Sequence, residues 1–286
     1  ASGAGVSTEM PALDSLSSQG ARLTAFYANP LCAATRSSFV FGQYNYRTGV
    51  YSGPAGGWPY GRDSSLGSVL STAGHEGVTV GKYAGSGSTD YPGWGAMEDG
   101  WEAMEVYNEQ TPSDFSSWTR TSGTQAQFQA LGAPPQSNTN TTAETVFVDT
   151  RHVDDAIALY QARDRSKNMV LYVAPHGIHD AAGGPYDPTK PAPHDGASCT
   201  DGADTCRERM ATQLDSDLAR LLAAVDTTRD FVVVAGDNGE DPDVNCKGTL
   251  AECGILVPAY VDGPGVSAGA TFGEVVRAAH EAGPRF

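Results

Sequence analysis

Short apolar segments recur along this chain, and segments with helical periodicity separate one from the next. The apolar runs predict strands at 22–28, 78–80, 145–148, 169–173, 231–234 and 255–261. The helical segments are 8–20, 32–44, 64–73, 152–163, 205–225 and 271–282. Apolar strands that alternate with helices are typical of a mostly parallel sheet with helices on both faces. The sequence therefore predicts an α/β fold, and 286 residues suffice for one domain with a large core over 1–286.

Two segments interrupt this alternation, 84–142 and 177–203. The first is rich in Gly, Ser, Thr, Pro, Trp and Gln, and the second is rich in Gly, Pro and Asp. Such compositions are typical of turns and loops, so both segments are expected to be long and irregular and to lie on the surface. We expect the determinants of substrate choice to lie in these loops.

The charge of the chain excludes one class of partner. Its 34 Asp and Glu outnumber its 18 Lys and Arg, which gives a formal net charge of −16 at pH 7. Nucleic acids and anionic membranes are bound by clustered Lys and Arg, so neither is an expected partner. No apolar run approaches the roughly 18 residues of a membrane span. The chain begins at Ala1 with no visible signal peptide, which indicates a processed or truncated N-terminus.

The cysteines form two close pairs and leave one residue over. They are Cys32, Cys199, Cys206, Cys246 and Cys253. Each pair is seven positions apart, no Cys-x-x-Cys occurs, and the histidines are not spaced as zinc-finger ligands, so a structural zinc site is not expected. Two local disulfides and a glycosylation sequon at Asn140 favour an oxidising compartment and a secreted protein. The alternative is a cytosolic protein with five free thiols, and in either case Cys32 has no obvious partner.

Unusual polar residues lie just beyond the predicted strands, where ligands bind in parallel sheets. They are Cys32, Arg36, Lys82, His176, His179, Asp237, Asn238 and, in the loop before the last strand, Lys247. This set combines cations, a helix start that suits an anion, and oxygen ligands for a hard metal ion. The expected ligand is a tetrahedral oxyanion, and a phosphate or sulfate ester fits the set better than a peptide or a sugar.

Several of these residues belong to blocks that resemble the type I sulfatases, the formylglycine-dependent, arylsulfatase-like family. The first block resembles their nucleophile region and reads MPALDSLSSQGARLTAFYANPLCAATR, from Met10 to Arg36. Further blocks follow in the family's order at 42–44, 47–50, 81–82, 174–176, 237–239 and 247–258. The resemblance covers most of 8–282. It implies the three-layer α/β/α sandwich of the alkaline-phosphatase superfamily and a sulfated glycan or a small sulfate ester as substrate.

The resemblance also implies a nucleophile. Cys32 matches the cysteine that is oxidised to formylglycine, whose hydrate attacks the sulfur of the ester in a covalent mechanism. Arg36, one helical turn later, would steady this group and offset its charge.

The remaining roles follow from the same resemblance. Asp237 and Asn238 match two calcium ligands, because both offer the hard oxygen atoms that calcium prefers. Lys82 and Lys247 would contact the sulfate oxygens, and His176 would protonate the leaving alcohol. His179 is a competitor for that last role. The other histidines match nothing in the family and are expected at the surface: His75, His152, His194 and His280.

The chain departs from the family pattern at several points. Sulfatases begin with a buried strand that ends in an Asp-Asp pair, whereas the only such pair here, Asp154-Asp155, lies on a predicted helix. The usual Pro two residues after the Cys is Ala34, and the usual Lys-x-His ends in Ala84. The smaller C-terminal subdomain of the family is also missing from 1–286.

These departures keep two functions open. The first is a secreted, calcium-dependent sulfatase whose first strand comes from another segment or chain. The second is a catalytically inactive protein of the sulfatase fold with a structural or binding role outside the cell.

Overall fold

The computed structural model describes residues 9–51, 64–83, 95–107, 115–130, 140–179, 203–239 and 246–273 of the chain. Its helices are α1 (Pro11–Gln19), α2 (Cys32–Phe41), α3 (Asn45–Thr48), α4 (Leu66–Thr72), α5 (Gly95–Glu98), α6 (Gln125–Ala130), α7 (Val148–Ala162), α8 (Ala203–Ala224) and α9 (Glu252–Ile255). Its strands are β1 (Ala21–Tyr27), β2 (Glu76–Lys82), β3 (Ala103–Tyr107), β4 (Trp118–Thr124), β5 (Asn140–Glu144), β6 (Met169–Ala174), β7 (Val232–Ala235), β8 (Leu256–Asp262) and β9 (Ala270–Phe272). Within the described segments, no helix has both the length and the apolar character that crossing a membrane would require.

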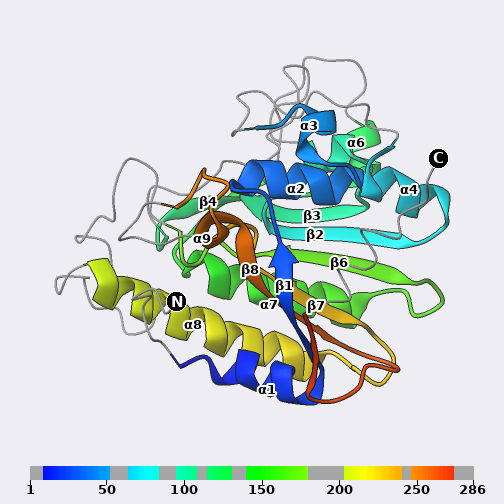
Figure 1. Ribbon diagram of the computed structural model, residues 1–286. Coiled ribbons are helices and arrows are strands. Elements are labelled where there is room, and N and C mark those ends of the chain that lie inside the picture. Colours follow the sequence, from blue (N-terminus) through cyan, green and yellow to red (C-terminus); the bar gives the residue numbers. More distant parts are fainter. Residues whose placement is uncertain are drawn as a thin grey trace.

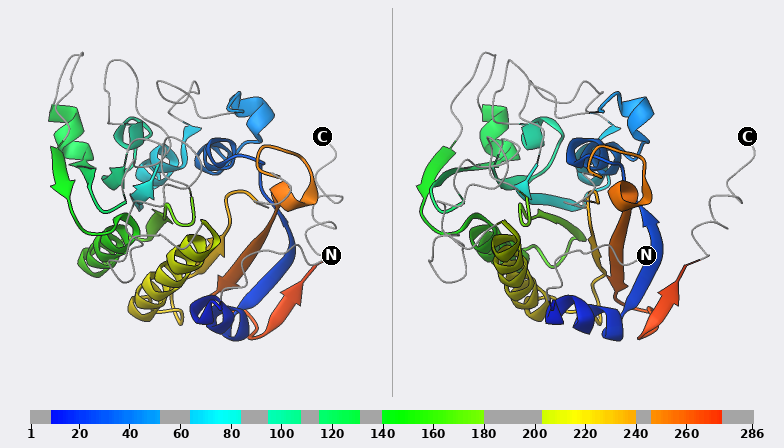
Figure 2. Two further views of the ribbon diagram at one scale, coloured as in Figure 1. Left: turned by 90° about the vertical axis from the view of Figure 1, so that its left-hand side faces the viewer. Right: turned by 60° about the vertical axis from the view of Figure 1, so that its left-hand side comes forward.

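Helices lie on both sides of the β-structure, as Figures 1 and 2 show. On one side α7 packs on β2, β3 and β6, and α8 contacts both α7 and α1. On the other side α2 contacts α4, which packs on β2. The predicted α/β class with its layered arrangement of helix, sheet and helix is therefore confirmed.

The strands form two mixed sheets. One has the order β5-β4-β3-β2-β6, and the other has the order β7-β8-β1-β9. Only the pairs β2–β3, β2–β6 and β1–β9 are parallel among the described strands. The pairs β3–β4, β4–β5, β1–β8 and β7–β8 are antiparallel. The expected predominance of parallel pairs is thus not found, because β3, β4 and β5 follow one another as antiparallel neighbours and β8 lies antiparallel to both β7 and β1.

β2 lies in the core, which covers it on both faces. Val78 and Val80 are fully buried and pack with Ala156 of α7. On the α2 side, Val40 belongs to a second buried cluster together with Trp101 of the α5–β3 connection. This burial on both faces explains why the sequence of β2 is an apolar run and not an alternating pattern.

The expectation of an irregular surface over 84–142 is wrong for the part of this segment that the structure describes. It contains the helices α5 and α6 and also β3, β4 and the start of β5, which belong to one sheet. Met104 and Val106 alternate along β3 and are fully buried, as are Met97 and Trp101. The composition of the whole segment hid this short alternation, and β4 is so rich in Thr and Ser that it lacks the apolar run of a core strand.

Most other predicted elements are confirmed within a few residues, including the helix at 205–225, which is α8. Two predictions near element ends are wrong. The strand expected at 145–148 is replaced by β5, which ends at Glu144, and by the start of α7 at Val148. The last helix was expected to begin at 271, but that residue lies in β9, and 274–286 lies outside the described residues.

A cleft of about 2470 Å³ lies between the two sheets and is lined by β6 and β7. β6 is the outermost strand of its sheet at this side, and so is β7 of the other. Phe231 and Val233 on the β7 side are 65% and 66% exposed, and 169–173 in β6 are only half-buried. No described strand pairs with the outer edge of β6 or β7, so apolar side chains and backbone hydrogen-bonding groups of both strands line the cleft.

Candidate active site

Cys32 is the first residue of α2 and follows β1 after a short turn. Thr35 holds this turn, because its hydroxyl accepts a hydrogen bond from the Asn29 N–H at 3.0 Å and donates to the Asn29 carbonyl oxygen at 3.3 Å. The thiol of Cys32 is free, and the residue is only 7% exposed. The helix start thus places one unpaired sulfur where backbone N–H groups and the helix dipole favour an anion.

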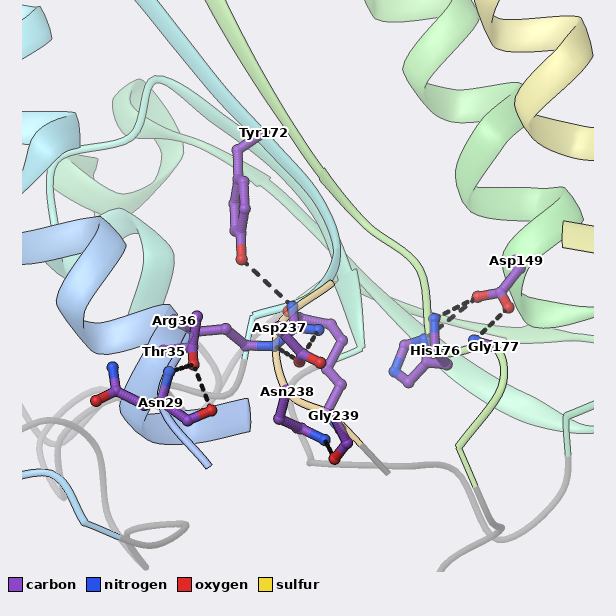
Figure 3. A network of polar contacts seen from close by, with 11 residues as sticks. Asn29, Thr35, Arg36, Asp149, Tyr172, His176, Gly177, Asp237, Asn238 and Gly239 are labelled. Atoms are coloured by element: carbon purple, nitrogen blue, oxygen red, sulfur yellow. Dashed lines mark hydrogen bonds and ion pairs between the residues drawn. The ribbon is translucent and has the colours of Figure 1, made fainter. Parts of the chain in front are cut away.

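Arg36 lies one turn further along α2 and connects the two sheets (Figure 3). Its Nε and Nη2 donate to Oδ2 of Asp237, beyond β7, at 3.0 and 2.8 Å. Its Nη1 donates to the carbonyl oxygen of Lys82, at the end of β2, at 2.6 Å and to the Tyr172 hydroxyl at 3.3 Å. Burial disfavours the cation, but the neighbouring Tyr172, Asp237 and Cys32 outweigh it and raise the pKa of Arg36. Arg36 is therefore charged and fixed in place.

Lys82 ends β2 and is only 2% exposed. Burial lowers the pKa of its ammonium group, and the charges of Arg36 and Lys247 lower it further, while Cys32 and Asp237 oppose them. Lys82 therefore interacts electrostatically with four other predicted site residues. They come from α2, the loop beyond β7 and the loop before β8.

Gly81 allows the end of β2 to take this position. Its φ is +94°, a conformation that residues with a side chain rarely adopt. A Cβ at this position would also collide with the carbonyl oxygen of Ala174 at the end of β6. The ends of β2 and β6 can therefore approach each other only because residue 81 is glycine.

Asp237 and Asn238 follow β7 directly. Burial raises the pKa of the Asp237 carboxyl group, but Arg36 and Lys82 outweigh it, and the pKa lies below its ordinary value. The Asn238 amide donates from Nδ2 to the Gly239 carbonyl oxygen at 3.0 Å, whereas its Oδ1 is buried without a hydrogen-bond partner among the described residues. A carboxylate beside an unsatisfied amide oxygen is a donor set that fits a hard cation such as calcium.

Lys247 lies in a small loop that the predicted disulfide closes. Cys246 and Cys253 are bonded, with their Cα atoms 5.6 Å apart. The next residue, Gly248, donates from its N–H to the Pro30 carbonyl oxygen at 2.9 Å, which ties this loop to the turn before α2. The loop thus holds Lys247 beside the start of α2. The other predicted pair, Cys199 and Cys206, lies outside the residues whose side chains are described.

His176 follows β6 and is 2% exposed. Its backbone N–H donates to Oδ1 of Asp149 at 2.6 Å, and the N–H of Gly177 donates to Oδ2 at 2.7 Å (Figure 3). Burial lowers the pKa of the His176 imidazole, and the charges of Lys82, Arg36 and His179 lower it further. His176 is therefore electrostatically linked to the cations of the site, and half-buried His179 lies next to it in the same loop.

The expectation that His152 lies at the surface is wrong, because it is fully buried and stacks on His176 with ring centroids 5.5 Å apart. His75 is half-buried, and His194 and His280 lie outside the described residues. The sequence does contain a signal for His152. It lies three residues after Asp149 and four before Ala156, so all three face the sheet from α7. Tyr172, the hydroxyl partner of Arg36, was also missed, because it reads as an ordinary apolar residue of β6.

Comparison with known proteins places this arrangement in a family. A model of the sulfatase family matches residues 1–275. The PsFucS1 sulfatase from Pseudoalteromonas sp. has a similar structure, with a TM-score of 0.70 and 19% identity over 92% of this chain and 58% of that one. This chain thus spans less than two thirds of the length of that protein.

Two further solved structures are similar. BT4656, in complex with its substrate D-glucosamine-2-N,6-O-disulfate, has a TM-score of 0.63 and 14% identity over 93% of this chain and 68% of that one. The phosphonate monoester hydrolase SpPMH from Silicibacter pomeroyi has a TM-score of 0.56 and 17% identity over 93% and 65%. No curated protein sequence matches the chain significantly. Since the family model spans nearly all of it, the chain belongs to the sulfatase family and, with that family, to the alkaline-phosphatase superfamily.

Proposed function

We propose that this chain carries the active site of a sulfuric ester hydrolase in which residue 32 provides the nucleophile. The observation that carries the proposal is the position of Cys32 at the start of α2, within electrostatic reach of the Arg36 and Lys82 cations. A helix start and clustered positive charge favour a negatively charged sulfate group at this point. The free thiol lies outside any disulfide of the described residues, which leaves it open to modification.

The modification we propose is conversion of Cys32 to formylglycine. The side chain CH₂SH and one water become an aldehyde and hydrogen sulfide, and two electrons and two protons pass to an oxidant, for which a maturing enzyme uses dioxygen. The hydrate of this aldehyde supplies an oxygen nucleophile for the sulfur of a sulfate ester. Arg36 holds its side chain beside this position and offsets negative charge there.

The other predicted residues bind the ester. Lys82 and Lys247 offer ammonium groups to the sulfate oxygens, and the burial of Lys82 strengthens its attraction because little water screens it. Asp237 and Asn238 would hold a calcium ion, which neutralises charge on a bound sulfate. His176 donates a proton to the oxygen of the departing alcohol.

The substrate class we propose is a sulfated glycan or a small sulfate ester. Its support is the similarity to BT4656, whose structure contains a sulfated glucosamine, together with the family membership. At sequence identities of 14–19%, this similarity supports the class of ester and does not identify a particular sugar.

We also propose that an extended segment completes the site by lying between β6 and β7. Both strands run towards the active site, since His176 follows one and Asp237 follows the other. A parallel strand placed between them would pair with both free edges, cover Phe231 and Val233, and end beside Asn238. Acidic residues at that end would add the ligands that a calcium ion needs beyond two.

Secretion belongs to the same proposal. The Cys246–Cys253 disulfide suits an oxidising compartment. The sequon at Asn140 begins β5, which is the outermost strand of its sheet on that side.

The second candidate function is a catalytically inactive binding protein of the sulfatase fold. The observation that favours it is the cation site, for which the described residues directly after β7 (236–239) offer only Asp237 and Asn238. With no further carboxylates this site would bind calcium weakly, and the fold would serve as a scaffold.

The experiment uses the complete protein that contains this chain, produced in a secretory host that has the maturing enzyme. Peptide mass spectrometry reads the mass at position 32, and hydrolysis of an aryl sulfate with and without a calcium chelator reads the activity. We expect an aldehyde at 32 and activity that the chelator removes. Cys32→Ala should abolish hydrolysis, whereas Ser71→Ala, at an exposed position of α4, should leave it unchanged.

An unmodified thiol at position 32, together with no hydrolysis, would refute the catalytic proposal and favour the scaffold. An aldehyde with calcium-independent hydrolysis would refute only the calcium site.

A further inference from the structure

The carboxylate of Asp149 is buried beside His176. It lies at the start of α7, is 1% exposed, and uses both oxygens to hold the loop after β6. Gly177 fits closely here, because a Cβ on it would lie 2.8 Å from Oδ2 of Asp149. Burial raises the pKa of Asp149, while the hydrogen bonds from His176 and Gly177, the neighbouring His152 and the charge of Lys82 oppose this. The carboxylate therefore fixes where the backbone of His176 lies.

Asp149 also faces the imidazole ring of His176. Its Oδ1 lies 3.7 Å from Nδ1 of that ring. On the other side, the His152 ring stacks on His176 at an interplanar angle of 23°, and the Trp118 ring contacts the His152 ring edge-on at 5.0 Å. Among the described residues, the Asp149 carboxylate and the His152 ring thus both contact the ring of His176.

This cluster of Asp149, His152 and His176 brings three potential metal ligands within 4.8 Å of one another. Its geometry argues against a shared ion. The lone pairs of an imidazole lie in the plane of its ring, and two nearly parallel stacked rings direct them along separate planes. The arrangement suits positioning of a ring rather than ligation of a metal.

We propose that Asp149 is the positioning residue of His176, fixing its ring and favouring its protonated form, and that His152 keeps the ring in its plane. This inference rests on the proposed function, in which His176 donates a proton to the leaving alcohol. It names the group that lets a buried imidazole carry that proton.

The charges around His176 show why such a group is needed. Lys82 from β2, Arg36 from α2 and His179 from the same loop all disfavour a second positive charge there, as does burial. His152 on α7 is neutral, because burial and the charge of His176 lower its pKa to about 3. Among the described residues, Asp149 places a carboxylate oxygen 3.7 Å from Nδ1 of the ring, and its negative charge would act in the opposite direction.

The first test does not require activity. The ring of His176 is observed by NMR through isotope-labelled histidine in the complete wild-type protein. The position of Asp149 predicts that the neutral ring carries its proton on Nδ1, and a proton on Nε2 would overturn the proposal. In Asp149→Asn the pKa of His176 should fall by about one unit or more. Asp217→Asn removes another buried carboxylate, on α8, and should leave it unchanged.

The second test uses aryl sulfates whose phenols span a range of acidity. A poor leaving group depends on the proton from His176 and a good one does not, so Asp149→Asn should lose more activity the more basic the phenol. His176→Ala should show the same trend. In the double variant, the loss of activity should depend no more steeply on the basicity of the phenol than in His176→Ala. An equal loss for all esters would mean a structural role only and would overturn the proposal. If the wild type cleaves no sulfate ester, the proposed function fails, while the NMR titration still decides the inference.

Discussion

At the scale of single residues, the buried positive charge of Arg36 organises the candidate site. Arg36 gives three of its nitrogen atoms to partners on β2, β6 and the loop beyond β7. A guanidinium group can do this because its N–H groups are spread in a plane, which the ammonium group of lysine cannot match.

Arg36→Lys should therefore lower the free energy of unfolding although it keeps the charge. We expect a loss of about 1–3 kcal/mol, since Asp237 and the Lys82 carbonyl oxygen lose directed hydrogen bonds to a charged group. Chemical denaturation measures this loss. The same change at exposed Arg22 is the matched control and should cost less than about 0.5 kcal/mol.

The buried neutral His152 makes stability depend on pH. In the folded protein its pKa is about 3, whereas its ordinary value is 6.5. Between these values the unfolded chain binds the extra proton, so the free energy of unfolding falls as the pH drops from 6.5 towards 3. This one group should account for about 2 kcal/mol between pH 7 and pH 5.

Denaturation curves of His152→Phe from pH 7 to pH 5 test this expectation, because phenylalanine takes up no proton. The variant should lose less stability than the wild type over this range. Equal slopes for His152→Phe and the wild type would contradict the prediction.

At the scale of elements, the ends of the strands decide where the chemistry lies. β2, β6 and β7 all end at the site, and their last residues are followed or formed by Lys82, His176 and Asp237. The close approach of β2 and β6 depends on the backbone of Gly81, with its φ of +94°.

Gly81→Ala should destabilise the protein by about 2–4 kcal/mol, because it adds both backbone strain and a collision with Ala174. Gly74→Ala is the matched control. Its φ is +74°, but a Cβ there meets nothing within 4 Å, so only about 1–2 kcal/mol of backbone strain is expected. Thermal or chemical unfolding compares the two, and equal losses would show that the contact with β6 does not matter.

The elements also show what could be predicted from sequence. The apolar run of β6 and the amphipathic pattern of α8 are long enough to be recognised without tertiary information. β4 cannot be recognised in this way, because Thr, Ser and Gly dominate its sequence. Its pairing with β3 and β5 is what makes it a strand. Local sequence carries no record of such pairing.

The residues of the candidate site also differ in how well they can be recognised from sequence. Charged residues that follow apolar strands, such as Asp237, stand out in the sequence because burial of a charge requires a reason. Asp149 and His152 stand out less, because their helical spacing with Ala156 marks a buried face of α7 but indicates no function. Their role comes from the packing of that helix against the end of β6, which only the three-dimensional structure reveals.

At the scale of the whole molecule, the two sheets remain apart. Each offers one free edge to the cleft, β6 on one side and β7 on the other. The apolar residues along these edges are what a central strand would cover, which is the arrangement proposed above.

Val233→Asp tests this arrangement in the complete protein. Val233 is 66% exposed in the chain described here, so a charge there is tolerated unless another segment covers it. We expect the complete protein to lose about 2 kcal/mol or more, because the charge would lie under the added strand. Val69→Asp, on α4 outside the cleft and 53% exposed, should change stability by about 0.5 kcal/mol or less. Equal and small effects would show that the cleft stays open.

The bridge made by Arg36 has a consequence for how this fold can change during evolution. In the proposed function this side chain supports the nucleophile, and in the structure it also ties the two sheets together, so its loss would weaken the fold itself. A descendant that no longer hydrolyses esters should therefore keep Arg36 and Asp237, because its stability still depends on them. Cys32, whose side chain belongs to no such tie in the described residues, is free to drift. Retention of Arg36 would therefore indicate descent from a sulfatase, whereas retention of Cys32 would indicate that the proposed reaction is still under selection.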